Sequence, residues 1–381
     1  MQEVQRVIII GPAHPLRGGL ASYNERLARA FQEAGCKTTI YTFSLQYPGF
    51  LFPGTTQYSS EPAPAHIDIR VRINSVNPFN WINVGRELRR LKPDILVVRF
   101  WLPFMGPCLG TILRYVQRKK NCRVICIADN MIPHEKRPGD LPFTRYFVAA
   151  VDGFVTMSRK VLEDLRHFTR TKPAVFVPHP LYDNFGGAVS MEEARRQLGL
   201  DQEDKLILFF GFIRPYKGLD LLLRAMATQP IREAGLRLLV AGEFYDQSQP
   251  YLNLIQELNL QDRVILRTQF IPDSEVRYYL CAANLVVQPY RSATQSGVTP
   301  LAYHFEKPMV VTNVGALPDM VPEGRVGLVC EPNPASLAET IARYFTLDET
   351  VFVKGIREEK KKYTWESMVN NITKMAHDIQ K

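Results

Sequence analysis

The sequence lacks the long apolar run that a membrane-spanning helix needs. No stretch of about 18 apolar residues occurs, and the first residues carry no signal-peptide pattern. The six cysteines include no CxxC pair and stand near no histidine cluster, which argues against a zinc site and against a disulfide framework. We therefore expect free thiols in a reducing cytoplasm, in a protein that is soluble or attached peripherally to the inner face of the cytoplasmic membrane.

Other functional signatures are also missing. The glycines that follow the first apolar run do not form GxGxxG, so a dinucleotide fingerprint is absent, and the acidic residues Asp246 and Asp273 are isolated rather than paired. Neither end of the chain is a basic arm, and the basic residues are not interleaved with aromatic residues in a stripe. We expect no metal, no cofactor and no nucleic-acid partner.

The composition that remains is that of a soluble globular protein. Of 381 residues, 46% are hydrophobic and 22% are charged, and the length suits two domains better than one. The formal net charge of +9 favours an anionic partner, such as a phosphorylated substrate or an anionic membrane surface.

Short apolar runs alternate with amphipathic stretches along the chain. Val7–Ile10 is typical of a buried parallel strand, a helical stretch follows Gly18 and Gly19, and Thr38–Tyr41 is typical of the next strand. The same rhythm predicts further strands at Ile67–Val71, Ile95–Val98, Val124–Ile127, Phe154–Thr156, Val175–Val177, Leu206–Phe210, Leu238–Ala241, Val264–Leu266, Leu285–Val287 and Met309–Val311. Strands and helices in alternation predict open, doubly wound α/β sheets.

The alternation of predicted strands and helices is interrupted at Pro178–Pro180 and at the polar stretch that follows, which suggests a linker. We therefore predict two Rossmann-like α/β domains of similar size facing a central cleft, at residues 1–183 and 184–365. Residues 366–381 are expected to form a helix that crosses back to the first domain. Ligands of such sheets bind outside the carboxyl ends of the strands.

The turn from Gly211 to Gly218 is the strongest chemical signal. Gly211 ends a predicted strand, and Arg214 and Lys217 stand before a predicted helix. Backbone N–H groups at a helix N-terminus favour negative charge, an arginine adds a bidentate fork and a lysine adds a point charge. The arrangement suits a diphosphate; the alternative is two surface cations on a turn.

Two other loops precede predicted helices. Gly18 and Gly19 allow a phosphate or sugar to approach the backbone closely, although an ordinary βα turn would look the same. The small residues between Ala293 and Leu301, with Pro300 suited to a first helical turn, are a candidate phosphate cradle or a simple loop.

Together these motifs resemble retaining glycosyltransferase family 4, on the GT-B fold, over nearly the whole chain. The segments that carry the resemblance are Arg17–Gly19, Lys92–Ile95, Gly211–Gly218, Val240–Glu243 and Pro308–Pro318. The resemblance implies metal-independent transfer of a sugar from a nucleotide-diphosphate sugar, UDP- or GDP-linked, to a hydroxyl of a cell-surface polysaccharide or glycolipid precursor. It assigns the acceptor to the N-terminal domain and the donor to the C-terminal domain.

The resemblance also implies roles for individual residues. The donor diphosphate would be held by Arg214, Lys217, Gly18, Gly19, Gly297 and Val298. The donor sugar and nucleotide would lie against Gln295, Ser296, Phe270, Ile271, Gly242 and Glu243, with Phe270 and Ile271 by the base.

The family's two glutamates, which have seven residues between them, are missing. Their places fall on or near Ala293 and Leu301, and Gln295 is a candidate replacement for the first. The first glutamate normally contacts the donor sugar and the second the nucleotide ribose. The alternatives are therefore a divergent transferase, a GT-B sugar-nucleotide epimerase, or a non-catalytic nucleotide- or glycan-binding protein.

On the acceptor side, the resemblance places Asp129 where a polar group faces the reacting carbon. Asp129 or His134 would orient or deprotonate the acceptor hydroxyl, although a structural hydrogen bond is the alternative for His134. Lys136 and Arg137 are candidates for binding an acidic or lipid-phosphate acceptor. The segment from Tyr47 to Phe52, with the basic excess, predicts peripheral contact with an anionic membrane, unless it packs in a core.

Overall fold

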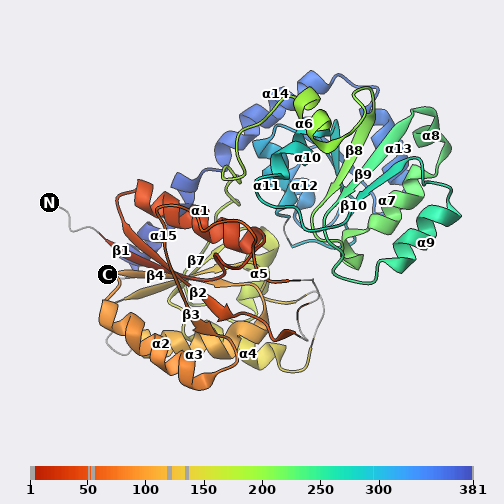
Figure 1. The fold of residues 1–381 in the computed structure, drawn as a ribbon. Helices are drawn as coiled ribbons and strands as arrows, with labels where there is room; N and C mark the ends of the chain where they lie inside the picture. Colours follow the sequence, from red (N-terminus) through yellow and green to blue (C-terminus); the bar gives the residue numbers. More distant parts are fainter. Residues whose placement is uncertain are drawn as a thin grey trace. The chain divides into compact units, whose positions relative to one another are not determined.

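The computed structural model describes residues 5–49, 52, 56–117, 122–133, 137–294 and 296–379. The chain divides into two compact units (Figure 1). Unit 1 comprises Met1–Phe52, Thr56–Pro180 and Thr364–Lys381, and unit 2 is formed mainly by Leu181–Tyr363. Each unit is built around one parallel sheet.

The sheet of unit 1 has seven strands, in the order β3-β2-β1-β4-β5-β6-β7. The strands are β1 (Arg6–Ile10), β2 (Lys37–Leu45), β3 (Asp68–Asn74), β4 (Ile95–Phe100), β5 (Arg123–Ala128), β6 (Gly153–Thr156) and β7 (Ala174–Phe176). Every residue of β4 is buried. Such a strand is covered on both faces of the sheet, which is why its sequence is a nearly continuous apolar run.

Helices cover both faces of this sheet (Figure 1). On one face lie α1 (Gly19–Glu33) and α15 (Trp365–Asp378), and on the other lie α2 (Pro78–Leu91), α3 (Gly106–Gln117) and α4 (Asp140–Ala149). The remaining helix, α5 (Arg159–Arg166), begins at the side-chain cap of Ser158. The helix α15 therefore joins unit 1 although it comes last in the chain.

The sheet of unit 2 has six strands, in the order β10-β9-β8-β11-β12-β13. They are β8 (Lys205–Phe210), β9 (Leu236–Ala241), β10 (Val264–Arg267), β11 (Leu285–Gln288), β12 (Met309–Thr312) and β13 (Gly327–Cys330). The α-helices are α6 (Met191–Leu198), α7 (Leu219–Met226), α8 (Gln229–Glu233), α9 (Gln249–Glu257), α10 (Val276–Ala282), α11 (Val298–His304), α12 (Leu317–Met320), α13 (Pro334–Tyr344) and α14 (Glu349–Glu359). The strand order reverses beside β8, which places a topological switch point there.

The predicted fold class is confirmed, since both units are parallel sheets wound on both faces by helices. The sequence analysis did not predict the strand β13. All six cysteines are free; five are buried and Cys36 is half-buried. In the described ranges, the helices are too short or too polar to cross a membrane.

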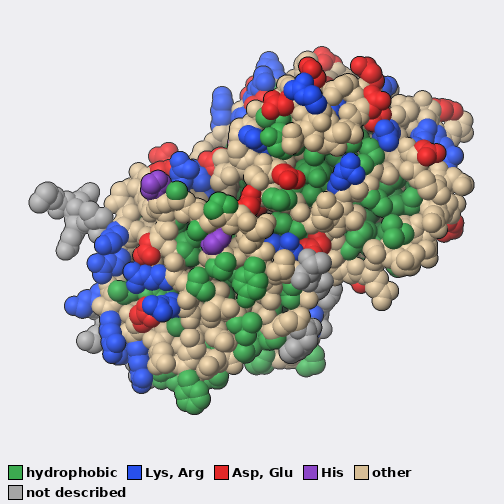
Figure 2. All heavy atoms as spheres, in the orientation of Figure 1, with side chains coloured by type: hydrophobic (Ala, Val, Ile, Leu, Met, Phe, Trp, Pro, Cys, Tyr) green, Lys and Arg blue, Asp and Glu red, His purple; other side chains and the backbone are tan. Residues whose placement is uncertain are grey.

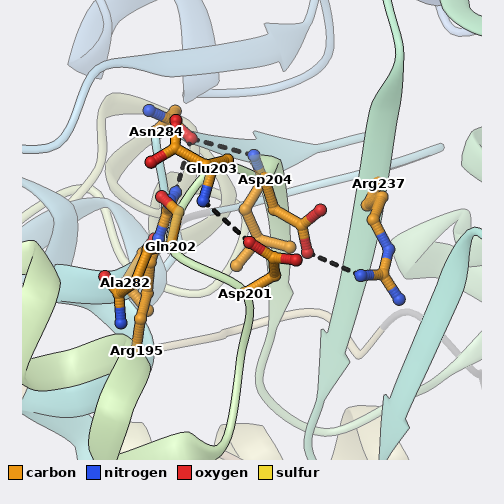
Figure 3. A network of polar contacts seen from close by, with 9 residues as sticks. Arg195, Asp201, Gln202, Glu203, Asp204, Arg237, Ala282 and Asn284 are labelled. Atoms are coloured by element: carbon orange, nitrogen blue, oxygen red, sulfur yellow. Dashed lines mark hydrogen bonds and ion pairs between the residues drawn. The ribbon is translucent and has the colours of Figure 1, made fainter.

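A buried arginine ties together the amino edge of the sheet in unit 2 (Figure 3). Arg195, on α6, donates from Nε to the carbonyl of Ala282 at 3.1 Å and from Nη2 to Oδ1 of Asn284 at 3.0 Å. It also donates to the carbonyl of Gln202. The same Asn284 oxygen accepts from the amide of Leu206 in β8 at 2.8 Å. The network occupies the edge opposite to the carboxyl ends of the strands.

We predict that Arg195→Ala lowers the free energy of unfolding by about 2–4 kcal/mol, because it removes a buried guanidinium that bonds three acceptors and leaves the carbonyl of the buried Ala282 without this donor. Arg196→Ala is the matched control: its guanidinium is exposed and, among the residues that the structure describes, pairs with Glu192, so the loss should stay within about 0.5 kcal/mol. Urea denaturation of both variants measures the difference. Equal losses would show that the network contributes nothing beyond helix propensity.

Candidate functional site

The carboxyl ends of β8 and β9 meet at two glycines. Gly211 has a φ of 96° and Gly242 a φ of 138°, values that residues with a Cβ rarely adopt. A Cβ on Gly242 would lie 2.3 Å from the carbonyl oxygen of Gly211, and one on Gly211 would lie 3.1 Å from Nζ of Lys217. The two glycines thus leave bare backbone beside the ammonium group of Lys217.

The basic turn follows Gly211 directly. Arg214 is extended and caps a short 3-10 helix, Pro215–Lys217, and Gly218 then takes the left-handed conformation at the start of α7. A Cβ on Gly218 would lie 2.0 Å from the carbonyl oxygen of Pro289, after β11. The glycine therefore lets the turn lie against the neighbouring strand end, at the switch point of the sheet.

The two cations of this turn have aromatic neighbours. The Arg214 guanidinium lies 5.1 Å from the ring centroid of Tyr245, and Nζ of Lys217 lies 5.8 Å from that of Tyr290. Neither cation forms an ion pair with a carboxylate among the described residues. Burial, with the nearby Arg214 charge, lowers the pKa of Lys217 to about 8. An anion bound here would offset both effects.

The start of α11 is held by a buried polar network. Ser296 Oγ donates to Oε1 of Gln288 at 2.5 Å, and Gln288 Nε2 donates to Oγ1 of Thr299 at 3.0 Å. The amide of Val298 donates to Ser296 Oγ at 3.1 Å, whereas Gly297 is the residue that precedes the helix. Of the two amides expected to face phosphate, that of Val298 thus has a side-chain acceptor already.

The two positions of the missing glutamates are buried and apolar in this chain. Ala293 and Leu301 are both buried, and a Cβ on Gly315 would lie 1.6 Å from the carbonyl oxygen of Ala293. The backbone at Ala293 is therefore packed closely. Gln295, the candidate replacement, lies outside the described residues.

An aromatic cluster stands beside the basic turn. Phe212 stacks on Tyr245 with ring centroids 4.0 Å apart and lies 6.4 Å from Phe270. Ile271, next to Phe270, is buried, and so is Glu243, whose carbonyl accepts from the amide of Ile213 at 2.8 Å. Sequence reasoning selected Phe270 and missed the other two rings, although both follow closely after the glycines that end β8 and β9.

In unit 1, the glycine turn lies at the carboxyl end of β1. Gly18 has a φ of 100° and precedes α1, of which Gly19 is the first residue. The turn therefore requires a glycine at the first position. The role of both glycines in binding a phosphate or a sugar stays a prediction.

Asp129 follows the carboxyl end of β5 and is paired with a buried arginine. Its oxygens accept from Nε and Nη2 of Arg99, on β4, at 2.5 and 2.6 Å. The Arg99 guanidinium also lies 3.8 Å from the ring centroid of Tyr23. The two hydrogen bonds use both carboxylate oxygens and fix the orientation of the side chain, so a role in orienting neighbouring groups fits this geometry. Sequence reasoning missed Arg99 because it lies inside an apolar run.

Of three other residues in this part of the chain, His179, His134 and Lys136, the structure describes only His179. His179 is buried, which lowers its pKa to about 3, and its Nδ1 lies 2.6 Å from the carbonyl of Pro180. A neutral, hydrogen-bonded histidine of this kind fits a structural role. His134 and Lys136 lie outside the described residues, so the roles proposed for them stay predictions.

The described side chains offer no metal site, since no three or more His, Cys, Asp and Glu residues cluster among them. The arrangement in unit 2 can instead bind an anion through two cations and bare backbone. The adjoining rings can pack against a flat, apolar group.

The chain is similar to several curated proteins. It is 29% identical over 198 residues to D-inositol 3-phosphate glycosyltransferase of Corynebacterium efficiens, covering 50% of this chain and 46% of that protein. It is 30% identical over 186 residues to the protein of that name from Mycolicibacterium smegmatis, covering 48% and 42%. The matched segments thus span about half the length of these relatives.

Solved structures share the fold along almost the whole chain. Sucrose-phosphate synthase from Thermosynechococcus elongatus superimposes with a TM-score of 0.74 at 18% identity, covering 98% of this chain and 99% of that one. Anabaena HepE, solved in complex with UDP and glucose, also gives 0.74, at 14% identity, covering 98% and 100%. At such low identity the likeness establishes the GT-B fold alone.

Two family models match consecutive parts of the sequence. The model described as Glycosyltransferase Family 4 matches residues 17–181, and the one described as Glycosyl transferases group 1 matches residues 190–362. Together they account for nearly the whole chain, which therefore belongs to glycosyltransferase family 4.

Proposed function

We propose that this protein transfers a sugar from a nucleoside-diphosphate sugar to an acceptor hydroxyl, without a metal ion and with retention of anomeric configuration. The observation that carries the proposal is the basic turn of unit 2, where Arg214 and Lys217 lie without carboxylate partners among the described residues. The names of the matched relatives and the UDP complex of HepE support it.

The leaving diphosphate is the group that most needs stabilisation. As the bond from the sugar to the diphosphate breaks, negative charge grows on the leaving oxygen, and positive charge fixed in advance lowers the barrier. Arg214 offers a bidentate fork and Lys217 a point charge, while Gly211 and Gly242 let the ligand reach backbone. The acceptor hydroxyl would enter from the face that the diphosphate leaves.

The aromatic cluster gives the nucleotide a place beside the diphosphate. Phe212, Tyr245 and Phe270 present rings next to Arg214, and a base is a flat group that packs on such rings. We assign the donor to the UDP- or GDP-linked class, with UDP first because HepE was solved with it. The sugar would lie near Glu243, Gln295 and Ser296.

The acceptor is proposed to be a hydroxyl of a cell-surface polysaccharide or glycolipid precursor, handled in the cytoplasm or at the inner face of the cytoplasmic membrane. The matched relatives are named for a phosphorylated inositol, so a phosphate-bearing acceptor is a candidate. Arg137 of the acceptor-side unit is exposed and suits such a group.

A second candidate function is binding of a nucleotide or glycan without catalysis. It is favoured by one observation, the buried apolar residues Ala293 and Leu301 at the two glutamate positions. A transferase releases nucleoside diphosphate only when an acceptor is present, whereas a binding protein releases none.

We predict that Lys217→Ala reduces turnover of the donor by about 100- to 1000-fold, the usual effect of removing one group that stabilises a developing negative charge. The measurement is release of nucleoside diphosphate in the presence of an acceptor extract. The matched control is Lys205→Ala. Lys205 is exposed at the start of β8, the strand that leads into the basic turn. Near-normal turnover in Lys217→Ala would mean that the diphosphate binds elsewhere.

The lowered pKa of Lys217 predicts a pH dependence of nucleotide binding. Below pH 8 the ammonium is charged in the free protein and attracts a diphosphate; above pH 8 binding must take up a proton. The affinity for UDP should therefore fall above pH 8, by up to about tenfold per pH unit. Calorimetric titration of the protein with UDP, from about pH 7 to about pH 9.5, measures this fall.

The stability of the ligand-free protein should change with pH in the opposite direction, rising where UDP affinity falls. Because the folded-state pKa of Lys217 lies below its ordinary value of 10.5, charging the lysine costs stability, which returns as the pH rises from about 8 towards 10.5. Lys217→Met should bind UDP more weakly and lose both pH effects. An unchanged break near pH 8 in this variant would assign the titration to another group.

The ion pair between Asp129 and Arg99 lets us predict how replacing Asp129 changes catalysis. Asp129→Asn should lower both the melting temperature and kcat/KM, because the Arg99 guanidinium loses a charged partner, but should leave the acidic limb of the pH–rate profile in place. His134→Ala should remove that limb if His134 accepts the acceptor proton. Loss of the limb in Asp129→Asn would identify Asp129 as the base instead.

A further inference from the structure

The positive charge of this protein belongs to one unit. Unit 1 contains 27 lysines and arginines against 15 aspartates and glutamates, whereas unit 2 contains 20 against 23. The formal excess of +9 is therefore made by unit 1 alone, while unit 2, which carries the basic turn, is slightly acidic overall. An anionic partner larger than the donor should thus meet unit 1.

One face of unit 1 exposes large apolar side chains. The helices α2, α3 and α4 lie side by side on one face of its sheet (Figure 1). Phe79, at the start of α2, is 79% exposed, and Leu141 and Phe143, at the start of α4, are 50% and 39% exposed. Each of these helices follows the carboxyl end of a parallel strand, so their first turns lie along the carboxyl edge of the sheet.

The same helices carry an excess of arginine. They contain five arginines, which are Arg86, Arg89, Arg90, Arg114 and Arg145, and two acids, Glu87 and Asp140. Both acids are engaged: Glu87 accepts from the hydroxyl of Tyr41, and Asp140 accepts from the amide of Arg137. Hydrophobic side chains with Lys and Arg beside them gather over this part of unit 1 (Figure 2).

Aromatic rings and arginines are interleaved on this face. The Arg114 guanidinium lies 3.7 Å from the ring centroid of Tyr146, and that of Arg86 lies 5.9 Å from the ring of Tyr115. A Cβ on Gly110 would lie 2.8 Å from the Tyr146 ring, so α3 and α4 are closely packed there. The face is therefore a rigid surface in which amphipathic rings stand beside positive charge.

The segment from Tyr47 to Phe52, by contrast, has half-buried rings at Tyr47 and Phe52. The Tyr47 ring is half-buried against the core of unit 1, its hydroxyl accepts from Nε1 of Trp101 at 2.6 Å, and it stacks on Phe52. Phe50 and Leu51 lie outside the described residues. The exposed apolar side chains that the structure describes in unit 1 include those of the α2–α3–α4 face.

We propose that the α2–α3–α4 face of unit 1 docks on an anionic lipid bilayer. Aromatic residues suit the headgroup region, and arginines near an anionic leaflet add attraction that does not require a deep pocket. A second copy of the chain is a poorer occupant, because it would bring two surfaces of the same positive charge together.

The direction of docking rests on the proposed function. The first turns of α2 and α4 lie at the carboxyl edge of the sheet, and ligands of parallel sheets bind beyond that edge. A bilayer against these turns would present an acceptor carried on a lipid directly to the acceptor-side unit. The charge and exposure of the face do not depend on that function.

The test is co-sedimentation of the full chain with vesicles of phosphatidylcholine, with and without phosphatidylglycerol. We expect binding to the anionic vesicles alone, weakening as salt is added. Arg90→Gln with Arg145→Gln should weaken binding by about fivefold for each arginine removed. Phe79→Ser with Leu141→Ser should weaken it by about tenfold, because the apolar anchors are lost.

Matched controls come from unit 2. Leu347 and Val351 are 45% and 54% exposed, so Leu347→Ser with Val351→Ser removes equally exposed apolar side chains. Arg224→Gln with Lys354→Gln removes two exposed cations of that unit. Neither control should change vesicle binding.

Several results would overturn the proposal. These are no binding to anionic vesicles, equal binding to neutral vesicles, or binding that survives both face variants. A dimer in light scattering that the face variants abolish would assign the face to a second copy instead.

UDP-induced thermal shifts of the same variants separate this proposal from the proposed function. Face variants that lose vesicle binding but keep the UDP shift support the docking surface. If the unaltered protein bound anionic vesicles but showed no UDP shift, the proposed function would fail while the docking surface stood.

Discussion

The candidate site of unit 2 depends on one electrostatic constraint. Arg214 and Lys217 lie together after the end of β8, and neither has a carboxylate partner among the described residues. Burial and the charge of Arg214 both disfavour the charged form of Lys217 and lower its pKa to about 8. A protein that needed Lys217 only for folding would place a carboxylate beside it. The arrangement makes sense if the compensating charge arrives with the ligand.

The glycines make that arrangement possible. Gly211, Gly218 and Gly242 all have positive φ, and a Cβ on Gly218 or Gly242 would lie within 2.3 Å of a neighbouring carbonyl oxygen. They let strand ends and the basic turn lie against each other, which crowds backbone rather than side chains around the ammonium group. The local geometry and the uncompensated charge therefore depend on the same residues.

In unit 1, by contrast, the buried cation Arg99 has a carboxylate partner, Asp129. Arg99 donates two hydrogen bonds to Asp129 and lies over the ring of Tyr23, so its charge is matched inside the unit. The positive excess of unit 1 lies instead on its surface, where Phe79, Leu141 and several arginines share one helical face. Unit 2 thus has its unpaired positive charge in a small site, whereas the positive excess of unit 1 is distributed over a surface.

The sequence by itself determined the fold class, most of the strands and the place of Arg214 and Lys217, because these follow from local apolar periodicity and from glycines at strand ends. It could not show that Arg99 reaches Asp129, since the two stand thirty residues apart and meet only because β4 pairs with β5. Nor could it tell that Tyr47 turns inward while Phe79 turns outward. Both are aromatic residues, and only tertiary packing decides which ring loses its contact with water.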